Sequence, residues 1–166
     1  MNDKRLEVRP ALAVDLPEIM RIFQSAKAFM RASGNHNQWV NGYPSEDLLR
    51  SDIENDQLFV ISRGDALCGV FAFIIGDDPT YAVIEDGSWL SDSRYGTIHR
   101  IGGDGSAHGI LRTAVEYAQQ RIGHLRIDTH EDNQPMQRAV VRNGFVRCGI
   151  IYLEDGSPRI AFEKLI

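Results

Sequence analysis

The stretch from Thr97 to Ile122 constrains the fold most strongly, because it joins a short strand to an amphipathic helix through a loop rich in glycine. We read Thr97–Ile101 as the strand. The helix is predicted from apolar residues that recur with a period of about 3.6, namely Ile110, Leu111, Ala114, Val115, Ala118 and Ile122. An apolar stripe of this kind is stable only when it packs on another layer, so the stretch predicts a helix lying on a sheet.

The loop itself holds Gly102, Gly103, Gly105 and Gly109. Glycines let backbone N–H groups converge, and the helix N-terminus adds the positive end of its dipole. Two interpretations stay open: an anion site, most often for phosphate, or a connection whose glycines only turn the chain. The GxxxxGK[ST] motif is absent, and the loop does not follow an N-terminal βαβ start with an acidic residue for a ribose. An anion site here is therefore of another kind.

The rest of the chain predicts an alternation of strands and helices. Strands are predicted at Leu6–Leu12, Gln57–Ser62, Ala66–Ile75, Leu125–Thr129, Phe145–Leu153 and Arg159–Lys164, with a further short one at Tyr81–Glu85. Helices are predicted from Asp15, as a cap with Glu18 in a capping box, to Met30; from Ser45 to Asn55; and from Asn133, as a cap, to Arg142. This order predicts an α/β (α+β) protein with a mixed sheet of about six or seven strands and helices on both faces, in a single domain over residues 1–166.

Charge and composition exclude several classes of function. The net charge of −5 argues against a general nucleic-acid binder or a binder of anionic membranes. Cys68 and Cys148 lie in apolar strand-like segments, so we expect buried thiols rather than a disulfide, and a cytoplasmic location. No apolar run reaches the roughly 20 residues that span a bilayer, and the first residues, MNDKRLEVRP, lack the apolar core of a signal peptide.

This order of elements, with a glycine-rich loop between the fourth strand and the third helix, resembles the GNAT superfamily of acyl-CoA-dependent N-acyltransferases over essentially the whole chain. The family pattern Q/R-x-x-G-x-G/A is approximated by Ser106–Leu111, and the later pattern of an Asn, a helix and Gly-Phe by Asn133 and Gly144-Phe145. The stretches QWVNGYP (Gln38–Pro44), His99-Arg100 and LRIDTHEDN (Leu125–Asn133) also resemble a subgroup of small bacterial GNAT proteins whose substrates are unassigned.

The resemblance implies acetyl-CoA as co-substrate and a set of residues that hold it. The pyrophosphate would be held by the backbone amides that follow Ser106, namely those of Ala107, His108, Gly109, Ile110 and Leu111. The pantetheine arm would pair with His99, Arg100, Ile101 and Gly102. Asn133 would line the cofactor cleft. Helix-start amides suit phosphate, and a free strand edge suits the pantetheine amides.

Three positions depart from the family pattern. Ser106 stands where Gln or Arg is usual, and Leu111 stands where Gly or Ala permits a close approach. Val140 stands where the family commonly has a Tyr that protonates the leaving thiolate. Because Val cannot donate a proton, a general acid would have to come from elsewhere or from solvent.

Candidate catalytic groups lie on the fourth and fifth strands. His99 suits the role of general base near neutral pH, and the alternative is a histidine that packs on the sheet. Asp128 and His130 are expected on one face of their strand, where they could reach a water near the amine; alternatively, Asp128 pairs with Arg126 or Arg100. The amide of Ile101 or its neighbours could polarise the thioester carbonyl.

Four further residues carry open interpretations. Trp39 and Tyr43 either line the acceptor pocket or pin their loop to the core. Tyr152 and Cys148 either replace the absent Tyr as proton donors or belong to the core. His130, Glu131 and Asp132 have no second spaced ligand pair, so no metal site is predicted; the two acidic residues favour the N-terminus of the following helix.

The sequence thus predicts an N-acetyltransferase that moves an acetyl group from acetyl-CoA directly to a primary amine of a small molecule or peptide. One alternative is a non-catalytic acyl-CoA-binding or sensing module, and another is a domain that binds a different phosphorylated ligand. The acidic balance favours a cationic acceptor. We expect no nucleic-acid or membrane partner, and a homodimer.

Overall fold

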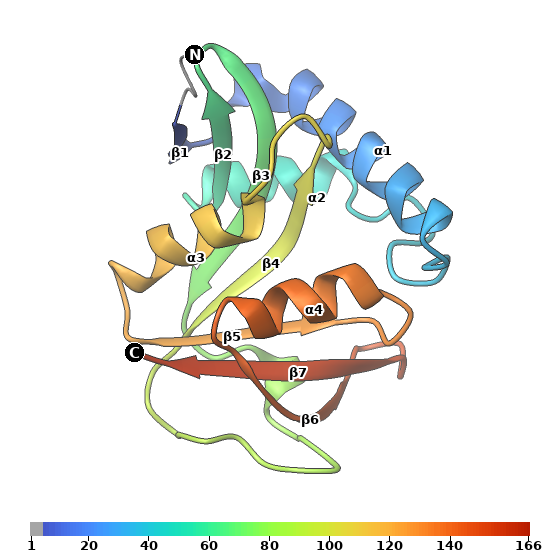
Figure 1. Cartoon of the computed structure of the whole chain (residues 1–166), viewed down its shortest axis with the longest axis vertical. Helices are drawn as coiled ribbons and strands as arrows, with labels where there is room; N and C mark the ends of the chain where they lie inside the picture. Colours follow the sequence, from blue (N-terminus) through green and yellow to red (C-terminus); the bar gives the residue numbers. More distant parts are fainter. Residues whose placement is uncertain (1–4) are drawn as a thin grey trace.

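The computed structural model describes residues 5–166, which form one seven-stranded mixed sheet in the order β1-β2-β3-β4-β5-β7-β6 (Figure 1). The strands are β1 (Leu6–Pro10), β2 (Leu58–Arg63), β3 (Ala66–Ile75), β4 (Gly96–Gly103), β5 (His124–Thr129), β6 (Val146–Tyr152) and β7 (Pro158–Leu165). The pairing of β4 with β5 is parallel, and the other neighbours are antiparallel. The predicted mixed sheet is therefore confirmed.

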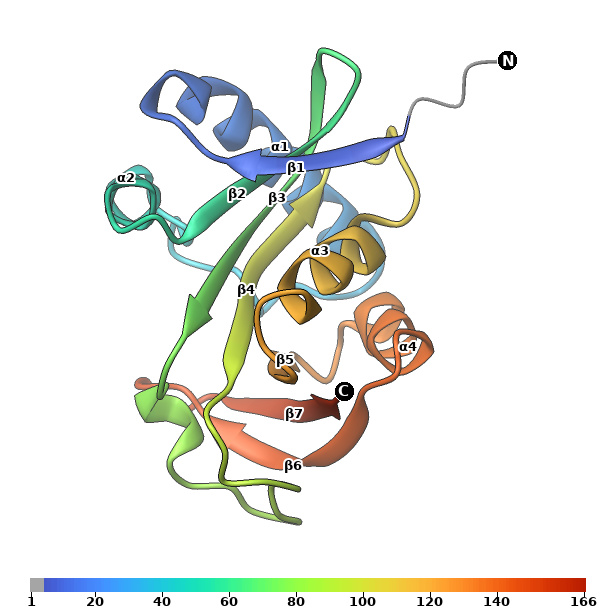
Figure 2. The same ribbon diagram turned by 90° about the vertical axis from the view of Figure 1, so that its left-hand side faces the viewer.

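Helices cover both faces of this sheet, as predicted (Figure 2). They are α1 (Leu16–Ala32), α2 (Glu46–Glu54), α3 (Ile110–Gln119) and α4 (Gln134–Arg142). Because side chains alternate along a strand, β2 supplies Phe59 and Ile61 to the core under α3 and α4, and Leu58 and Val60 to the core under α1 and α2. The sheet is thus buried on both faces, which explains its long apolar strands.

Two local predictions were wrong. The stretch Tyr81–Glu85 is not a strand: Asp78 caps a 3₁₀ turn over Pro79–Tyr81, and Glu85 makes only an isolated bridge to Ile150. Asp15 occupies the N-cap position of α1, but its side chain accepts no hydrogen bond from the helix, because its carboxylate binds Arg9 and the Leu12 amide instead. Glu18 forms no capping box and binds Arg21 instead. The expectation about the N-terminal leader concerns a stretch whose first residues, 1–4, lie outside the described part.

Strand β4 contains the irregularity that opens the sheet. Val70 pairs with Gly102 and Ala72 with His99, so Arg100 and Ile101 together oppose one residue of β3 in a β-bulge. Arg100 takes the left-handed conformation, with φ of 47°. On the other side, β4 pairs with β5 only at Gly96–Leu125 and Thr97–Arg126. Beyond Thr97 the two strands diverge, and no strand within residues 5–166 pairs with this edge of β4.

Candidate active site

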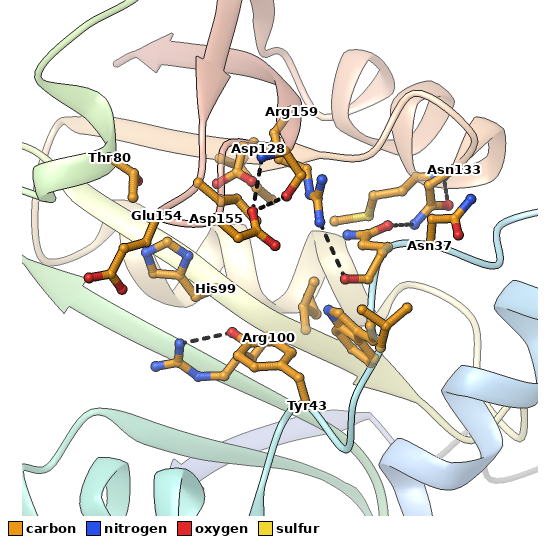
Figure 3. Close-up of a pocket in the computed structure, with 18 of the residues that line it drawn as sticks. Asn37, Tyr43, Thr80, His99, Arg100, Asp128, Asn133, Glu154, Asp155 and Arg159 are labelled. Carbon is orange, nitrogen blue, oxygen red and sulfur yellow. Dashed lines mark hydrogen bonds between the residues drawn. The ribbon is translucent and has the colours of Figure 1, made fainter.

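A cavity of about 640 Å³ lies where β4 and β5 diverge (Figure 3). Its walls come from β4 (Ile98–Ile101), β5 (Ile127 and Asp128), the segment between α1 and α2 (residues 37–43) and the turn between β6 and β7. These elements are distant in sequence, and the bulge with the early end of the β4–β5 pairing brings them around one space. The cavity combines both signs of charge with the apolar walls of Trp39 and Leu153.

A second cavity, of about 670 Å³, lies further along β4 at the predicted anion loop. Its lining includes Gly103 to Gly105, Ala107 to Arg112, two residues of α1 and the C-terminal end of α4. Gly109 is the N-cap of α3 with φ of 81°, a conformation that favours glycine. An added Cβ at Gly109 would meet nothing within 4 Å, so the start of α3 opens into free space. This geometry suits an anion at a helix N-terminus.

Of the predicted cofactor residues of this loop, Ser106 points elsewhere and Leu111 is largely buried. Ser106 lines neither cavity, because its amide and hydroxyl both donate to Asp104, at 2.9 and 2.5 Å. Burial opposes ionisation of Asp104, but these bonds and one from Arg21 outweigh it and lower the pKa of the carboxyl. Leu111 is 8% exposed and joins the core, so its bulk is directed mainly under the helix.

His99 projects from β4 into the first cavity and is held by Asp78. Its Nε2 lies 2.9 Å from Asp78 Oδ2, and both side chains are largely buried. Burial opposes ionisation of Asp78, but hydrogen bonds from His99 and Thr80 outweigh it and lower its pKa to about 2. The cavity therefore contains an imidazole oriented by an ionised carboxylate, the arrangement of a positioned acid–base group.

Asp128 lines the same cavity from β5, and its partner was not predicted. Tyr81 donates its hydroxyl to Asp128 Oδ1 at 2.6 Å, so neither Arg126 nor Arg100 pairs with Asp128. Tyr81 is 2% exposed; burial, followed by the Asp128 charge, raises its pKa well above the ordinary tyrosine value. Tyr81 therefore stays protonated and orients the carboxylate.

His130 does not join Asp128 at the cavity. Strand β5 ends at Thr129, so the alternation that placed both side chains on one face does not continue. His130 Nδ1 accepts a hydrogen bond from the Asp132 amide at 3.0 Å, in the turn before α4, and His130 lines neither cavity. Its geometry is that of a turn residue.

The Arg100 side chain is bound by other side chains of the protein. It forms a bidentate ion pair with Asp52 of α2, at 2.9 and 3.0 Å, and its Nη1 donates to the Tyr43 hydroxyl at 3.3 Å. Burial raises the pKa of Asp52, and the nearby guanidinium partly offsets this. Any contribution of the bulge to a cofactor therefore falls to the backbone of His99 to Gly102, while Arg100 anchors Tyr43 at the cavity wall.

Gln38 joins the segment between α1 and α2 to the rest of the site. Its Oε1 accepts hydrogen bonds from Asn133 at 2.9 Å and from Asn35 at 2.8 Å. Asn133 caps α4 as predicted, since its Oδ1 accepts the Met136 amide. Trp39 packs edge-on against Phe23 of α1, with ring centroids 5.3 Å apart. Trp39 and Tyr43 both line the cavity, so they combine a wall position with a role in pinning the loop.

Sequence reasoning missed Gln38, Asp78, Tyr81 and Arg159 as cavity groups or their direct supports. Arg159 lies at the start of β7, is 5% exposed, and donates to two backbone carbonyls, those of Pro158 at 2.8 Å and Gln38 at 3.3 Å. One signal was present: a charged residue at a predicted buried strand position is unusual unless it has a partner. The other three depend on contacts between distant segments.

None of the predicted substitutes for the missing proton donor lies at either cavity. Val140 is fully buried in the core. Tyr152 donates to Glu85 on the surface. Burial, with the nearby Glu163, raises the pKa of Cys148 to about 11. Among the tyrosines of residues 5–166, Tyr43 is the one that lines the first cavity; the other hydroxyl side chains in its lining are those of Thr80 and Ser157.

Two further features of the described residues bear on function. No group of three or more His, Cys, Asp or Glu side chains in residues 5–166 is arranged to hold a metal ion. None of the helices in the same part of the chain has the length and apolar character needed to cross a membrane.

Comparison with known proteins gives a consistent family match. Residues 5–146 match the model of the acetyltransferase (GNAT) domain. A solved GNAT-family acetyltransferase from Streptococcus agalactiae is 29% identical, with 97% of this chain and 95% of that chain covered and a TM-score of 0.88. A search of curated proteins finds no match.

Two solved structures with named substrates share the fold. One is an acetyl transferase from Salmonella typhimurium that modifies the N-terminal serine of 50S ribosomal subunit protein L7/L12 (18% identity, 97% and 95% covered, TM-score 0.65). The other is the ribosomal-protein-S18-alanine N-acetyltransferase from Escherichia coli (17% identity, 98% and 94% covered, TM-score 0.63).

Proposed function

The chain belongs to the acetyltransferase (GNAT) domain family, and we propose that it transfers an acetyl group from acetyl-CoA directly to a primary amine. The observation that carries this proposal is the succession of two cavities along β4: one beside His99, and one at the open N-terminus of α3. A bulged, unpaired strand edge connects the residues that line them. Two structural neighbours bear names that describe acetylation of protein amines, which supports an amine as the acceptor class.

The residues of this chain fit acetyl-CoA at three points. Amides at the start of α3, including those of Gly109 and Ile110, suit the pyrophosphate. The β4 edge beyond Thr97 offers backbone groups to the pantetheine amides. Asn133 borders the same opening from the N-cap of α4. Acetyl-CoA supplies an activated thioester, whose carbonyl carbon is open to attack by a neutral amine.

In the proposed reaction the amine nitrogen forms a bond to the acetyl carbonyl carbon, and the carbon–sulfur bond breaks. The nitrogen loses a proton, and the thiolate gains one. His99, oriented by Asp78, takes the proton directly or through one water, with Asp128 holding the ammonium form before deprotonation. The thiolate is protonated by solvent or by Tyr43, because Val140 lies in the core.

One rival function has a specific observation in its favour. A non-catalytic acyl-CoA-binding module would need the same cofactor geometry but no proton donor, and Val140 occupies the position where the family commonly has a Tyr. Both functions predict acetyl-CoA binding, and only the enzyme predicts turnover with an amine.

The first test is calorimetric titration with acetyl-CoA and with ATP, followed by an assay of CoA release with a panel of amines. We expect binding of acetyl-CoA without comparable binding of ATP. Gly109→Glu should abolish acetyl-CoA binding, because it adds a negative charge and a strained backbone at the start of α3. Gly64→Glu is the matched control, since Gly64 also has a positive φ, of 63°, but lines neither cavity.

Two results would decide against the proposal. Unchanged acetyl-CoA affinity in Gly109→Glu would remove the anion site. Tight binding without turnover of any amine would favour the sensing module.

A further inference from the structure

The Arg159 guanidinium is a buried charge that has no carboxylate partner among the residues that the structure describes. Arg159 is 5% exposed, and its two hydrogen-bond acceptors are the neutral carbonyls of Pro158 and Gln38. No ion pair joins Arg159 to a carboxylate within residues 5–166. Buried charges are normally paired, because desolvation is costly. The cost here is visible as a pKa lowered by burial, which the more distant Asp128 and Asp155 only partly offset.

Two other largely buried arginines have a carboxylate or aromatic partner. Arg100 forms its bidentate pair with Asp52. Arg126 lies 3.8 Å from the Glu163 carboxylate and stacks over the rings of Trp89 and Tyr95. Arg159 differs from both, because within residues 5–166 it has neither a carboxylate in an ion pair nor an aromatic ring beneath its guanidinium. Like Arg100, it lines the cavity.

Strand register places Arg159 beside Asp128. Asp128 of β5 pairs with Ala161 of β7, so Arg159, two residues before Ala161, is a diagonal neighbour on the same face of the sheet. Such diagonal positions are roughly 7 to 8 Å apart between Cα atoms. The two side chains do not pair: Asp128 accepts from Tyr81, and Arg159 donates to Gln38. Figure 3 shows both on the cavity wall formed by the β5–β7 side of the molecule.

We propose that the acceptor is an amino carboxylic acid, whose carboxylate binds the Arg159 guanidinium and whose amine lies between Asp128 and His99. This inference rests on the proposed acetyl transfer and specifies its acceptor. The planar guanidinium fork matches a carboxylate in geometry and charge. A phosphate dianion is less well suited, because Asp128 and Asp155 line the same cavity. A zwitterion matches the neighbouring opposite charges of Arg159 and Asp128 in this lining, and it replaces the purely cationic acceptor expected from the net charge.

The proposal separates free amino acids from peptides and simple amines. The N-terminal residue of a peptide has an amide where a free amino acid has its carboxylate, so it lacks the partner for Arg159. An amino acid amide reproduces this difference with the side chain unchanged. Its amine is the less basic of the two, so a preference for the acid cannot come from a larger fraction of neutral amine.

The test compares kcat/KM for the standard L-amino acids with kcat/KM for the corresponding amino acid amides, using acetyl-CoA and measuring CoA release. For the best acceptor we expect the acid to exceed its amide by more than about tenfold, the range for a lost charge-assisted hydrogen bond. Arg159→Gln should remove most of this preference, mainly through KM for the acid. Arg159→Lys should restore part of it, because the charge returns without the fork.

Arg147→Gln is the matched control, since Arg147 is an exposed residue of β6 that lines neither cavity. It should keep the wild-type preference. If Arg159 only anchors Gln38, Arg159→Gln should lower kcat/KM for the acid and for the amide by the same factor. That result would overturn the proposal. Equal rates for acid and amide in the wild-type protein, or turnover of amines with no amino acid accepted, would also overturn it and leave acetyl transfer intact.

A binding measurement tests the Arg159 site even if the protein does not acetylate any amine. N-acetyl amino acids carry the carboxylate but lack the reactive amine, and ligand-observed NMR can compare them with their amides in the presence of CoA. Stronger binding of the acids, lost in Arg159→Gln, would support the Arg159 site even if acetyl transfer fails. Equal binding of both forms would remove the site whatever the outcome of the titration with acetyl-CoA.

Discussion

Two carboxylates of the same cavity have different tasks because they have different partners. Asp78 is paired with His99, and hydrogen bonds hold its pKa at about 2 against the effect of burial. Asp128 is paired with the neutral Tyr81 hydroxyl and lies near Arg159. We infer that Asp78 orients the base and that Asp128 meets the amine. At the residue scale, function follows from the partner of each group more than from its type.

The role of His99 predicts a pH dependence. His99→Ala should lower kcat by about 10²- to 10⁴-fold, the usual range for a general base. It should also abolish the decrease of the wild-type rate at low pH, because no imidazole is left to be protonated. Rates of CoA release across a pH series measure both effects. His36→Ala is the control, since His36 is exposed and lines neither cavity; an unchanged pH profile in His99→Ala would exclude His99 as the base.

Asp78 predicts a pH dependence of stability with a definite sign. Its pKa is about 2 in the folded chain and 3.8 in the unfolded reference, so its ionised form stabilises the fold above the unfolded pKa. The contribution, about 2 kcal/mol at neutral pH, should vanish as pH falls from about 4 to about 2. Urea unfolding of wild type and Asp78→Asn should therefore differ at pH 7 and converge in acid. Asp65→Asn, in the exposed β2–β3 turn, should show no such convergence.

At the scale of elements, the segment 77–95 holds two side chains of the site in place. A buried cluster fixes it: Glu163 of β7 accepts from the Leu90 amide and from His124, and Arg126 donates to the Ser91 carbonyl. The same segment carries Asp78 and Tyr81, the partners of His99 and Asp128. The stability of one loop therefore sets the orientation of two candidate catalytic side chains.

Removing Glu163 should loosen this segment. Glu163→Ala leaves His124 and Arg126 buried without their carboxylate, which typically costs about 3 to 5 kcal/mol. Hydrogen exchange of residues 77–95 should rise more than that of β2 and β3. Glu163→Gln keeps the volume and tests the charge if the alanine variant does not fold. Lys164→Met, at the next position with its side chain on the other face, should leave the segment unchanged; equal exchange in all three variants would contradict the anchoring role.

At the scale of the whole molecule, both faces of the sheet are closed by helices, and both thiols lie inside. Cys68 is 2% exposed and Cys148 is 6% exposed. Burial raises the pKa of each, with the charge of Asp104 adding to the effect at Cys68 and that of Glu163 at Cys148. Neither thiol has the lowered pKa of a reactive cysteine.

The thiols should therefore report unfolding. An aromatic disulfide reagent should modify the native protein at least about 100-fold more slowly than the urea-unfolded chain, because reaction requires opening of the structure. Saturating acetyl-CoA should slow the reaction further if it binds the native state alone. Rapid modification of one thiol in native buffer would show a local opening at β3 or β6.

The sequence by itself determined the features that depend on neighbouring residues. The helical stripe of α3, the strands β2 and β3, the start of α3 after the glycine-rich loop and the Asn133 cap each follow from local sequence, and the structure has them where the sequence predicts them. The order of these elements, together with the patterns at Ser106–Leu111 and Gly144-Phe145, resembles the GNAT superfamily, and the structure has the mixed sheet that this resemblance implies. Asp15 shows the limit of such reasoning, since Arg9 outcompeted the helix for its carboxylate.

Only the tertiary structure decided which polar groups meet. Asp128 and Tyr81 are 47 residues apart, Arg100 and Asp52 are 48 apart, and Gln38 and Asn133 are 95 apart. A strand pattern predicts the face of a side chain, but its partner depends on how the bulge at Arg100, the early end of the β4–β5 pairing and the turn at Pro79 arrange distant segments. Periodicity carries only local information. The cavity and the position of Arg159 within it therefore depend on tertiary packing.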